Sequence, residues 1–315
     1  MTPEISVLLP VRDAGRYLGR ALDDVLGQQD VALEVVAVDD GSTDASARVL
    51  RERAAADGRL RVLESGGAGA AAALAVALGA ARAPLIAHME ADDRSHPERL
   101  ARLRDALARH PDWDGVVSRA RLIGAPGEGM RRYVAWQDSL RTPETMARAR
   151  FVEIPALHQT GLYRRRRLET IGGYASDRRW PVDIDFWMRW FEAGARIGKV
   201  DRALYGWRQH RRQSTRTSPL HRLETLRACK AWYFVRGPAR GGPIDVVSVG
   251  RTLAGWCDAL RSAGAGDVRA ISWRTRGPLP PTRPDAARLF AYGTARVRAR
   301  VAGLLGGGDR DWFAA

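Results

Sequence analysis

Cysteine and long uncharged runs are scarce in this sequence, and both shortages exclude classes of protein. The two cysteines, Cys229 and Cys257, rule out a disulfide framework, and each lies among helix-forming residues as a small buried side chain would. The long uncharged stretch that covers residues 66–81 is shorter than the ~20 residues that a membrane-spanning helix needs. Residues 1–4 lack the basic start of a signal peptide. We therefore expect a soluble protein in a reducing, cytoplasmic setting.

Lysine is also scarce, so almost all of the positive charge comes from arginine. Lysine and arginine together number 51 against 36 acidic residues, which gives a formal net charge of +15. Such an excess fits an anionic partner: nucleic acid, an anionic membrane face or a nucleotide sugar. It fits equally a proteome in which arginine simply replaces lysine, and we favour this second interpretation.

Short apolar runs alternate with amphipathic segments up to residue 123. The pattern predicts strands at residues 5–10, 33–38, 59–63, 85–89 and 116–123, with helices at 17–28, after residue 44, at 70–81 and from residue 95. Strands and helices that alternate at this spacing favour an α/β fold with a doubly wound, mainly parallel sheet. In such sheets the ligand lies beyond the carboxyl ends of the strands.

Acidic side chains follow two of these predicted strands. Asp39 and Asp40 begin the first cluster, and residues 90–93, with the sequence EADD, form the second. A carboxylate at the first position can accept the imide N–H of a uracil, whereas the second offers oxygen ligands to Mg²⁺ or Mn²⁺. A metal there neutralises charge on a departing nucleoside diphosphate. The arrangement favours an enzyme with a nucleotide-linked donor, although either cluster alone also fits helix capping.

The rest of the chain is less regular. We expect helices at 164–171, 185–193 and 222–236, a breaker at 237–243, a strand–helix–strand unit over 244–273, and a final amphipathic helix over 285–305. The predicted division is 1–220 for the main domain, 221–243 for a helix and linker, and 244–315 for a small Rossmann-like accessory unit. Residues 250–255 lack a full G-x-G-x-x-G, so an interaction or scaffold role is favoured over a dinucleotide site.

Several motifs together resemble glycosyltransferase family 2 across roughly residues 4–215. They are VLLPVRD at 7–13, YLGRAL at 17–22, VDDGSTD at 38–44, and EADD with SHPERL at 90–100. The resemblance implies a GT-A fold, a nucleotide-sugar donor and inversion at the anomeric carbon.

The resemblance also implies roles for residues on the donor side. Three residues would border the base: Pro10, Val11 and Asp13. Asp40 would bind the nucleobase with support from Asp39, and Asp92 would be the main metal ligand. Glu90 stands where the family usually has Asp, and it would ligate the cation or bind the ribose. His210 closes the YGWRQH segment and is a candidate third metal ligand.

On the acceptor side, the segment VDIDFW at 182–187 resembles the family's Glu-Asp motif. Asp183 would be the general base that takes the proton of the acceptor hydroxyl. Val182 replaces the usual Glu, and Asp185 is expected to be structural. The other acceptor candidates are Trp180 and Trp187, which could stack on a ring, and His158. Core packing is the alternative for both tryptophans.

The sequence therefore predicts a metal-dependent inverting glycosyltransferase with Mn²⁺ or Mg²⁺ as cofactor and a UDP-sugar as the favoured donor. The acceptor would be a glycan, a lipid-linked sugar or a small molecule, as in glycan or cell-surface polysaccharide synthesis. A peripheral contact with the anionic inner face of the membrane is compatible with the charge. One alternative is transfer to a modified nucleoside in tRNA, on a faint resemblance to queuosine galactosyltransferases. The other is a degenerate nucleotide-binding protein, which Glu90 and Val182 favour but intact Asp40, Asp92 and Asp183 oppose.

Overall fold

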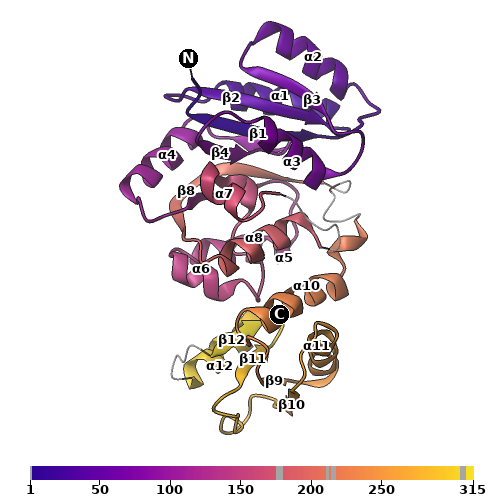
Figure 1. The fold of residues 1–315 in the computed structure, drawn as a ribbon, viewed down its shortest axis with the longest axis vertical. Coiled ribbons are helices and arrows are strands. Elements are labelled where there is room, and N and C mark those ends of the chain that lie inside the picture. Colours follow the sequence, from indigo (N-terminus) through magenta and orange to yellow (C-terminus); the bar gives the residue numbers. More distant parts are fainter. Residues whose placement is uncertain (1, 175–179, 211–212, 214–217, 306–309) are drawn as a thin grey trace. The chain divides into compact units, whose positions relative to one another are not determined.

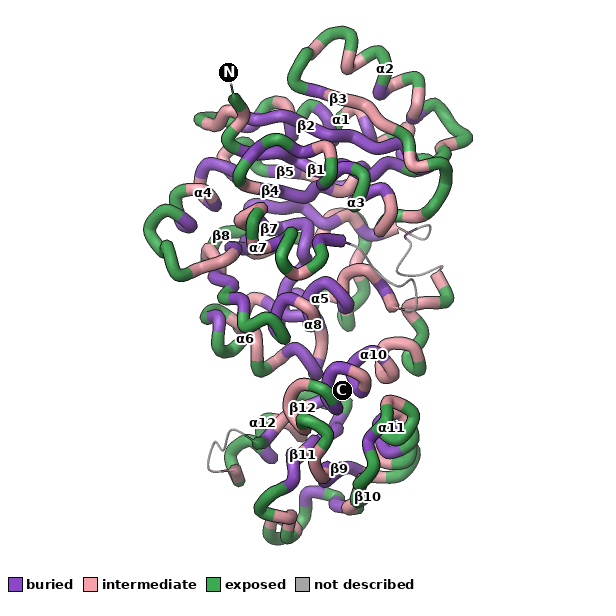
Figure 2. The backbone as a smooth tube through the Cα atoms, viewed as in Figure 1, coloured by how far each residue is buried: buried purple, intermediate pink, exposed green. Residues whose placement is uncertain are grey.

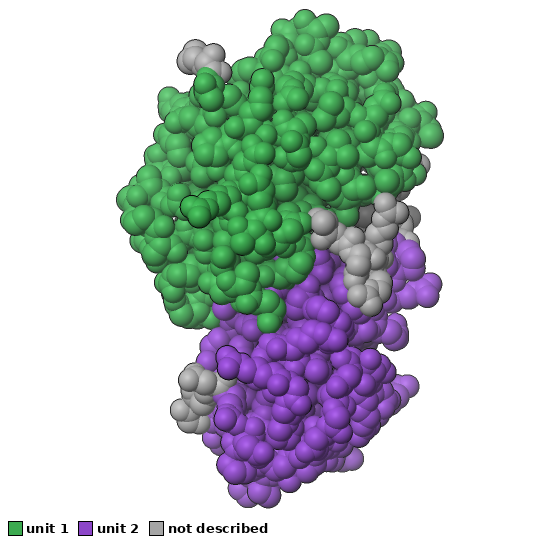
Figure 3. All heavy atoms as spheres, viewed as in Figure 1, with its two compact units in different colours: residues 1–146, 156–178, 189–217 green, residues 147–155, 179–188, 218–315 purple. Residues whose placement is uncertain are grey.

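The computed structural model describes residues 2–174, 180–210, 213, 218–305 and 310–315. The chain forms two compact units (Figure 3). The first comprises Met1–Met146, Ala156–Arg178 and Arg189–Thr217, and the second comprises Ala147–Pro155, Arg179–Met188 and Ser218–Ala315. The second unit thus takes two short segments from before residue 220 as well as the tail. The functional division expected at residues 220 and 243 stays a prediction.

The first unit is built on an eight-stranded sheet in the order β3-β2-β1-β4-β7-β6-β8-β5. Figure 1 labels β1 to β4 and β8 of this sheet. The strands are β1 Ile5–Val11, β2 Leu33–Asp39, β3 Leu60–Glu64, β4 Leu85–His88, β5 Arg94–Ser95, β6 Gly115–Gly124, β7 Gly161–Arg164 and β8 Ile197–Gln209. The strands β1 to β4 pair in parallel. The strand β7 runs antiparallel to both β4 and β6, and β8 is parallel to β6. The predicted α/β class with a mainly parallel sheet is confirmed.

The helices that follow β1 to β4 are α1 Gly15–Leu26, α2 Ser46–Ala56, α3 Ala70–Ala80 and α4 Arg99–Arg109. The later ones are α5 Glu128–Ser139, α6 Pro143–Ala149, the 3-10 turn η1 His158–Thr160, α7 Arg165–Thr170 and α8 Val182–Glu192. All residues of β1 and β2 are buried, as Figure 2 shows, which is why both read as continuous apolar runs. The helix expected from residue 95 begins at Arg99, because residues 94–95 pair with β8 instead.

The second unit holds a four-stranded, fully parallel sheet in the order β10-β9-β11-β12. Its elements are α10 Leu223–Arg236, β9 Ile244–Ser248, α11 Gly250–Ser262, β10 Val268–Ser272, β11 Ala287–Ala291, α12 Ala295–Leu304 and β12 Asp311–Ala314. The strand–helix–strand prediction over 244–273 is confirmed. Among the described residues, no helix of either unit is both long and apolar enough to cross a membrane.

The prediction of a single helix over residues 285–305 is wrong. Residues Ala287–Ala291 form a strand between β9 and β12, and the helix begins only at Ala295. Phe290 is fully buried in a cluster with Val247, Trp273 and Tyr292. Local propensity does not distinguish the two states here, and pairing with two distant strands decides for the strand.

Asp245, fully buried at the second position of β9, is held by two arginines of its own unit. Its Oδ1 accepts hydrogen bonds from Arg269 Nε at 3.0 Å and Arg283 Nε at 2.9 Å. Burial alone would raise the pKa of Asp245, but the hydrogen bonds from Arg269 and Arg283 outweigh burial and lower it. Stability from this group is therefore present above the unfolded pKa of about 3.9, and it is lost as the pH falls through the lower folded value.

We predict that Asp245→Asn lowers the free energy of unfolding at pH 7 by about 1.5–3 kcal/mol, because charge-assisted hydrogen bonds to both guanidinium groups are lost. Urea unfolding at pH 7 and at pH 3 measures this, and the variant should lose less stability on acidification than the wild type. Asp258→Asn on the exposed face of α11 is the matched control. Equal unfolding energies for Asp245→Asn and the control would contradict the prediction.

Candidate active site

The carboxyl ends of β1 and β2 are tied together by their following loops. The N–H of Asp40 donates to the carbonyl of Val11 at 2.8 Å, and the Asp39 carboxylate accepts the N–H of Ser42 at 3.1 Å. Asp13 adopts a φ of 48°, a left-handed conformation that few non-glycine residues take. Its Oδ1 accepts the N–H of Thr43 at 2.7 Å. Pro10 and Val11 end β1 beside this loop, so the structure brings all of these predicted donor-side residues to one rim of the sheet.

Asp40 is 3% exposed and already has protein donors. Its Oδ1 accepts from Ser65 Oγ at 2.7 Å and from the Gly69 N–H at 3.0 Å, and Arg12 Nη1 lies 3.4 Å from Oδ2. A carboxylate offers roughly four lone-pair positions. The Gly69 N–H also lies 3.1 Å from Oδ2, so four contacts use these positions, and the longest is the 3.4 Å contact from the exposed Arg12 side chain.

The end of β4 meets the end of β8 at the second acidic cluster. Asp92 Oδ2 lies 2.7 Å from His210 Nε2, within hydrogen-bond distance. Arg208 holds the two segments together, because its Nε donates to the Asp92 carbonyl at 2.6 Å and its N–H donates to Asp93 Oδ1 at 2.7 Å. The structure thus brings together the two residues that the sequence predicts as metal ligands.

The carboxylates of this cluster are buried and repel one another. Burial raises the pKa of Asp92, the charge of Glu90 adds to the rise, and His210 opposes it. Burial and then the charge of Asp92 raise the pKa of Asp93 well above its usual range. A bound cation would relieve both the burial of charge and the repulsion. Carboxylate oxygens with one imidazole suit Mn²⁺ or Mg²⁺, so the residues present fit the predicted ion.

Sequence reasoning missed three side chains that shape this rim. The Tyr205 hydroxyl oxygen accepts the Glu90 N–H at 3.1 Å. Tyr17 of α1 lies under the Arg208 guanidinium at 4.6 Å, and its ring centroid is 5.7 Å from that of His210. Tyr205 and Arg208 lie within the YGWRQH segment, so that motif was an available signal for both. Tyr17 begins the YLGRAL motif at residues 17–22, which was the signal available for it.

A comparison with protein families decides the identity of this arrangement. The family model described as Glycosyl transferase family 2 matches residues 6–172, just over half of the chain. The chain belongs to glycosyl transferase family 2. The order of motifs that suggested this resemblance is therefore confirmed as a family relationship, and the protein is a transferase.

Relatives of this glycosyltransferase match part of its length. EpsE of Bacillus subtilis (strain 168) is 30% identical over 207 residues, which cover 64% of this chain and 72% of EpsE. The succinoglycan biosynthesis protein ExoU of Rhizobium meliloti (strain 1021) is 33% identical over 123 residues, 39% of this chain and 34% of ExoU. Chondroitin synthase of Escherichia coli is 24% identical over 208 residues, 65% of this chain and 29% of that protein. The chain thus matches about a third of the length of the last two.

Solved structures show the same fold. TarS 1–349 of S. aureus in complex with UDP-GlcNAc has a TM-score of 0.59 at 21% identity, covering 74% of this chain and 67% of that one. The mannosyltransferase PcManGT of Pyrobaculum calidifontis, in complex with GDP-Man and Mn²⁺, has a TM-score of 0.53 at 21% identity. The match covers 75% of this chain and 63% of that one. The GT-A-type fold expected for the glycosyltransferase is confirmed.

The predicted acceptor residue Asp183 lies in the second unit, in the first turn of α8. Burial raises the pKa of its carboxyl, and His221 opposes the rise, with His221 Nε2 3.9 Å from Asp183 Oδ1. A carboxylate whose pKa is raised is a better proton acceptor, as a general base must be. Asp185, two residues on, is buried and accepts the Tyr233 hydroxyl at 2.8 Å, which fits the structural role expected for it.

The remaining acceptor candidates lie in different surroundings. Trp187 is 1% exposed and packs edge-on against Phe186 with ring centroids 5.3 Å apart, whereas Trp180 is partly exposed. His158 belongs to the first unit and is 5% exposed, and its ring centroid lies 4.7 Å from that of His88. The packing of Trp187 is that of a core residue. The acceptor roles of all three residues stay predictions.

Proposed function

We propose that this glycosyltransferase is metal-dependent and inverting, and that it moves a sugar from a nucleoside-diphosphate sugar, UDP-linked by preference, to an acceptor hydroxyl. The observation that carries the proposal is the contact between Asp92 and His210 at the rim that also holds the buried Asp40 carboxylate. Structural relatives in complex with UDP-GlcNAc or with GDP-Man and Mn²⁺ support a nucleotide-sugar donor. Relatives named for succinoglycan biosynthesis and chondroitin synthesis support a glycan acceptor in polysaccharide synthesis.

Each of the predicted residues has a distinct task in this proposal. Asp40 would accept a base N–H, with Asp39 and the Asp13 loop holding its position. Asp92 and His210 would hold Mn²⁺ or Mg²⁺, and the ion, when bound, neutralises charge on the departing diphosphate. Asp183 would take the proton of the acceptor hydroxyl as the new glycosidic bond forms. Inversion follows because the acceptor attacks opposite the leaving group in a single displacement.

Nucleotide binding tests the donor side. We expect one of UDP, GDP, dTDP and CDP, with UDP favoured, to raise the melting temperature in the presence of Mn²⁺ and to have little effect with EDTA. At a nucleotide concentration of about 100 Kd the stabilisation is about 2.7 kcal/mol, enough for a rise of several degrees. The nucleoside without its diphosphate is the control. No shift with any nucleotide would contradict the proposal and would favour a degenerate protein.

A further inference from the structure

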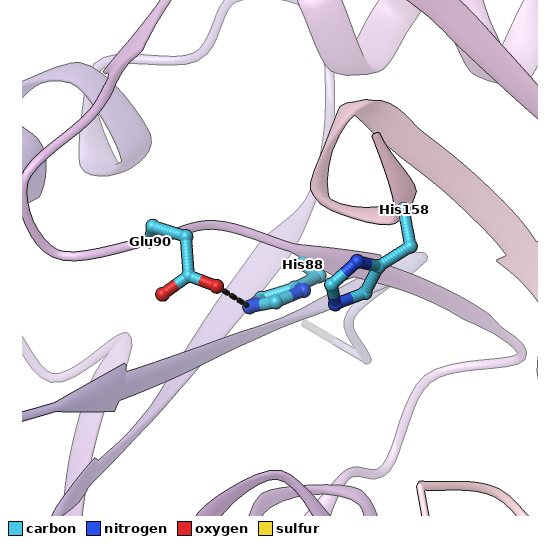
Figure 4. A group of neighbouring side chains, drawn as sticks. All are labelled: His88, Glu90 and His158. Atoms are coloured by element: carbon cyan, nitrogen blue, oxygen red, sulfur yellow. Dashed lines mark ion pairs between the residues drawn. The ribbon is translucent and has the colours of Figure 1, made fainter. Parts of the chain in front are cut away.

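Two histidines and a glutamate converge inside the first unit, apart from the Asp92–His210 pair (Figure 4). His88 is the last residue of β4, Glu90 follows two residues later, and His158 begins η1. One ligand atom from each side chain lies within 4.8 Å of the others. Two chain segments that are 70 residues apart in sequence thus present an N, N, O donor set to one point.

The His88 ring is an unexplained polar group. The residue is 0% exposed, and neither of its ring nitrogens makes a hydrogen bond within the described part of the chain. Its Nε2 lies 3.2 Å from Glu90 Oε1, and its ring centroid is 4.7 Å from that of His158. Buried polar atoms nearly always have a partner, and an unpartnered one costs about 1–3 kcal/mol. A metal ion bound between the three side chains would give the His88 ring a bonded partner.

The backbone around this cluster is held firmly. Arg99, fully buried, donates from Nη1 to the Gln159 carbonyl at 2.8 Å and to the His88 carbonyl at 3.3 Å. The Tyr163 hydroxyl donates to the His158 carbonyl at 2.7 Å. Both histidines are therefore anchored through their main chain while their rings stay directed at each other. These contacts hold the main chain of both ligand segments, as a preorganised site requires.

We propose that His88, Glu90 and His158 bind a divalent transition-metal ion, with Zn²⁺ the best fit. Two imidazoles and one carboxylate are ligands that Zn²⁺ accepts readily, whereas Mg²⁺ and Ca²⁺ require mainly oxygen. Tetrahedral Zn²⁺ with bonds of about 2.0–2.1 Å holds its ligands roughly 3.4 Å apart, so modest side-chain rotations close the site. The fourth position is left to water, which enters beside the Glu90 side chain, 35% exposed.

This site is distinct from the metal site of the proposed donor complex. It uses no ligand of the Asp92–His210 pair, and it commits the Glu90 carboxylate to His88 rather than to a donor ribose. The bound ion would link the end of β4 to η1 and so stabilise the first unit. The inference goes beyond the proposed function and holds whether or not the chain transfers a sugar.

Metal titration of the chelator-treated, full-length protein tests the proposal. The background is the double variant Asp92→Asn with His210→Ala, which removes the other pair. Zn²⁺ should bind once per chain by calorimetry, Co²⁺ should give the visible absorption of a low-coordinate nitrogen–oxygen site, and Zn²⁺ should raise the melting temperature. In this background Glu90→Gln and His158→Phe should each weaken Zn²⁺ binding by at least about 100-fold, beyond the 10–100-fold loss typical of an outer-shell partner.

Two controls keep the result specific. Glu64→Gln, an exposed glutamate, and His110→Gln, an exposed histidine, should leave Zn²⁺ affinity unchanged. Because Glu90 is partly exposed, Glu90→Gln should fold even if His158→Phe does not, and circular dichroism checks each variant. Failure of Zn²⁺ to bind the background protein, or undiminished binding in Glu90→Gln, would overturn the proposal. Neither result bears on nucleotide binding, which is measured on the wild type with Mn²⁺.

Discussion

Asp183→Asn is expected to lower kcat for sugar transfer by about 10²–10⁴-fold while nucleotide affinity stays unchanged, the range that loss of a general base produces. The substitution keeps the size of the side chain but removes its ability to take a proton. Burial of Asp183 raises the pKa of its carboxyl, which makes the carboxylate a stronger base. Donor turnover with water or a glycan as acceptor measures kcat, and UDP titration measures nucleotide affinity.

Asp185→Asn is the matched control for this variant. It makes the same chemical change two residues further along α8, and its amide oxygen can still accept the Tyr233 hydroxyl. We expect kcat near that of the wild type. A loss of similar size in both variants would mean that the amino-terminal turn of α8 is merely structural, and retention of activity in Asp183→Asn would exclude it as the base.

The pH dependence of turnover provides a second test of Asp183 as the general base. A base must be deprotonated, so a raised pKa moves the acidic limb of the rate profile above the ordinary aspartate value of about 3.9. His221 is the neighbour that lowers the Asp183 pKa, so His221→Gln should move that limb to higher pH. If the acidic limb of the rate profile does not move in His221→Gln, His221 does not set the pKa of the catalytic base, which would contradict the prediction.

Asp92→Asn is expected to abolish metal-dependent nucleotide stabilisation and to lower metal-dependent donor hydrolysis by at least about 100-fold. A metal contributes several kcal/mol at a departing diphosphate, and each 1.36 kcal/mol is about tenfold in rate. The amide can keep its contact with His210, so the variant removes charge rather than packing. Thermal shift with UDP and Mn²⁺, together with release of UDP from the sugar nucleotide, measures both effects.

Asp105→Asn is the control for general effects of lost charge. Asp105 is exposed and pairs with Arg104 at the surface, where such pairs contribute little. It should retain both the Mn²⁺-dependent shift and hydrolysis. Full metal-dependent hydrolysis in Asp92→Asn would place the cation elsewhere.

The donor side of the site was predictable because local patterns carry it. The buried strands Ile5–Val11 and Leu33–Asp39 read as continuous apolar runs, and parallel pairing then brings their carboxyl ends to one rim. The pairing of Asp92 with His210 came from the family resemblance rather than from spacing, since the two residues lie 118 positions apart.

Long-range packing explains what the sequence did not reveal. Residues 285–305 carry helix-forming side chains, yet Ala287–Ala291 is a strand because β9 and β12 lie on either side of it. His88 reads as part of an apolar strand, and only the meeting of β4 with η1 shows that its ring nitrogens make no hydrogen bond within the described residues. Arg99, a surface residue by type, is fully buried because two backbone carbonyls accept its hydrogen bonds.

The position of the bound cation tests the central claim most directly. Crystals grown with UDP and Mn²⁺ would be measured at a wavelength where manganese scatters anomalously. We predict a peak in the anomalous difference map within coordination distance of Asp92 and His210, adjoining the diphosphate of a nucleotide whose base contacts Asp40. A nucleotide bound at this rim with no manganese peak beside Asp92, or bound away from Asp40, would contradict the account.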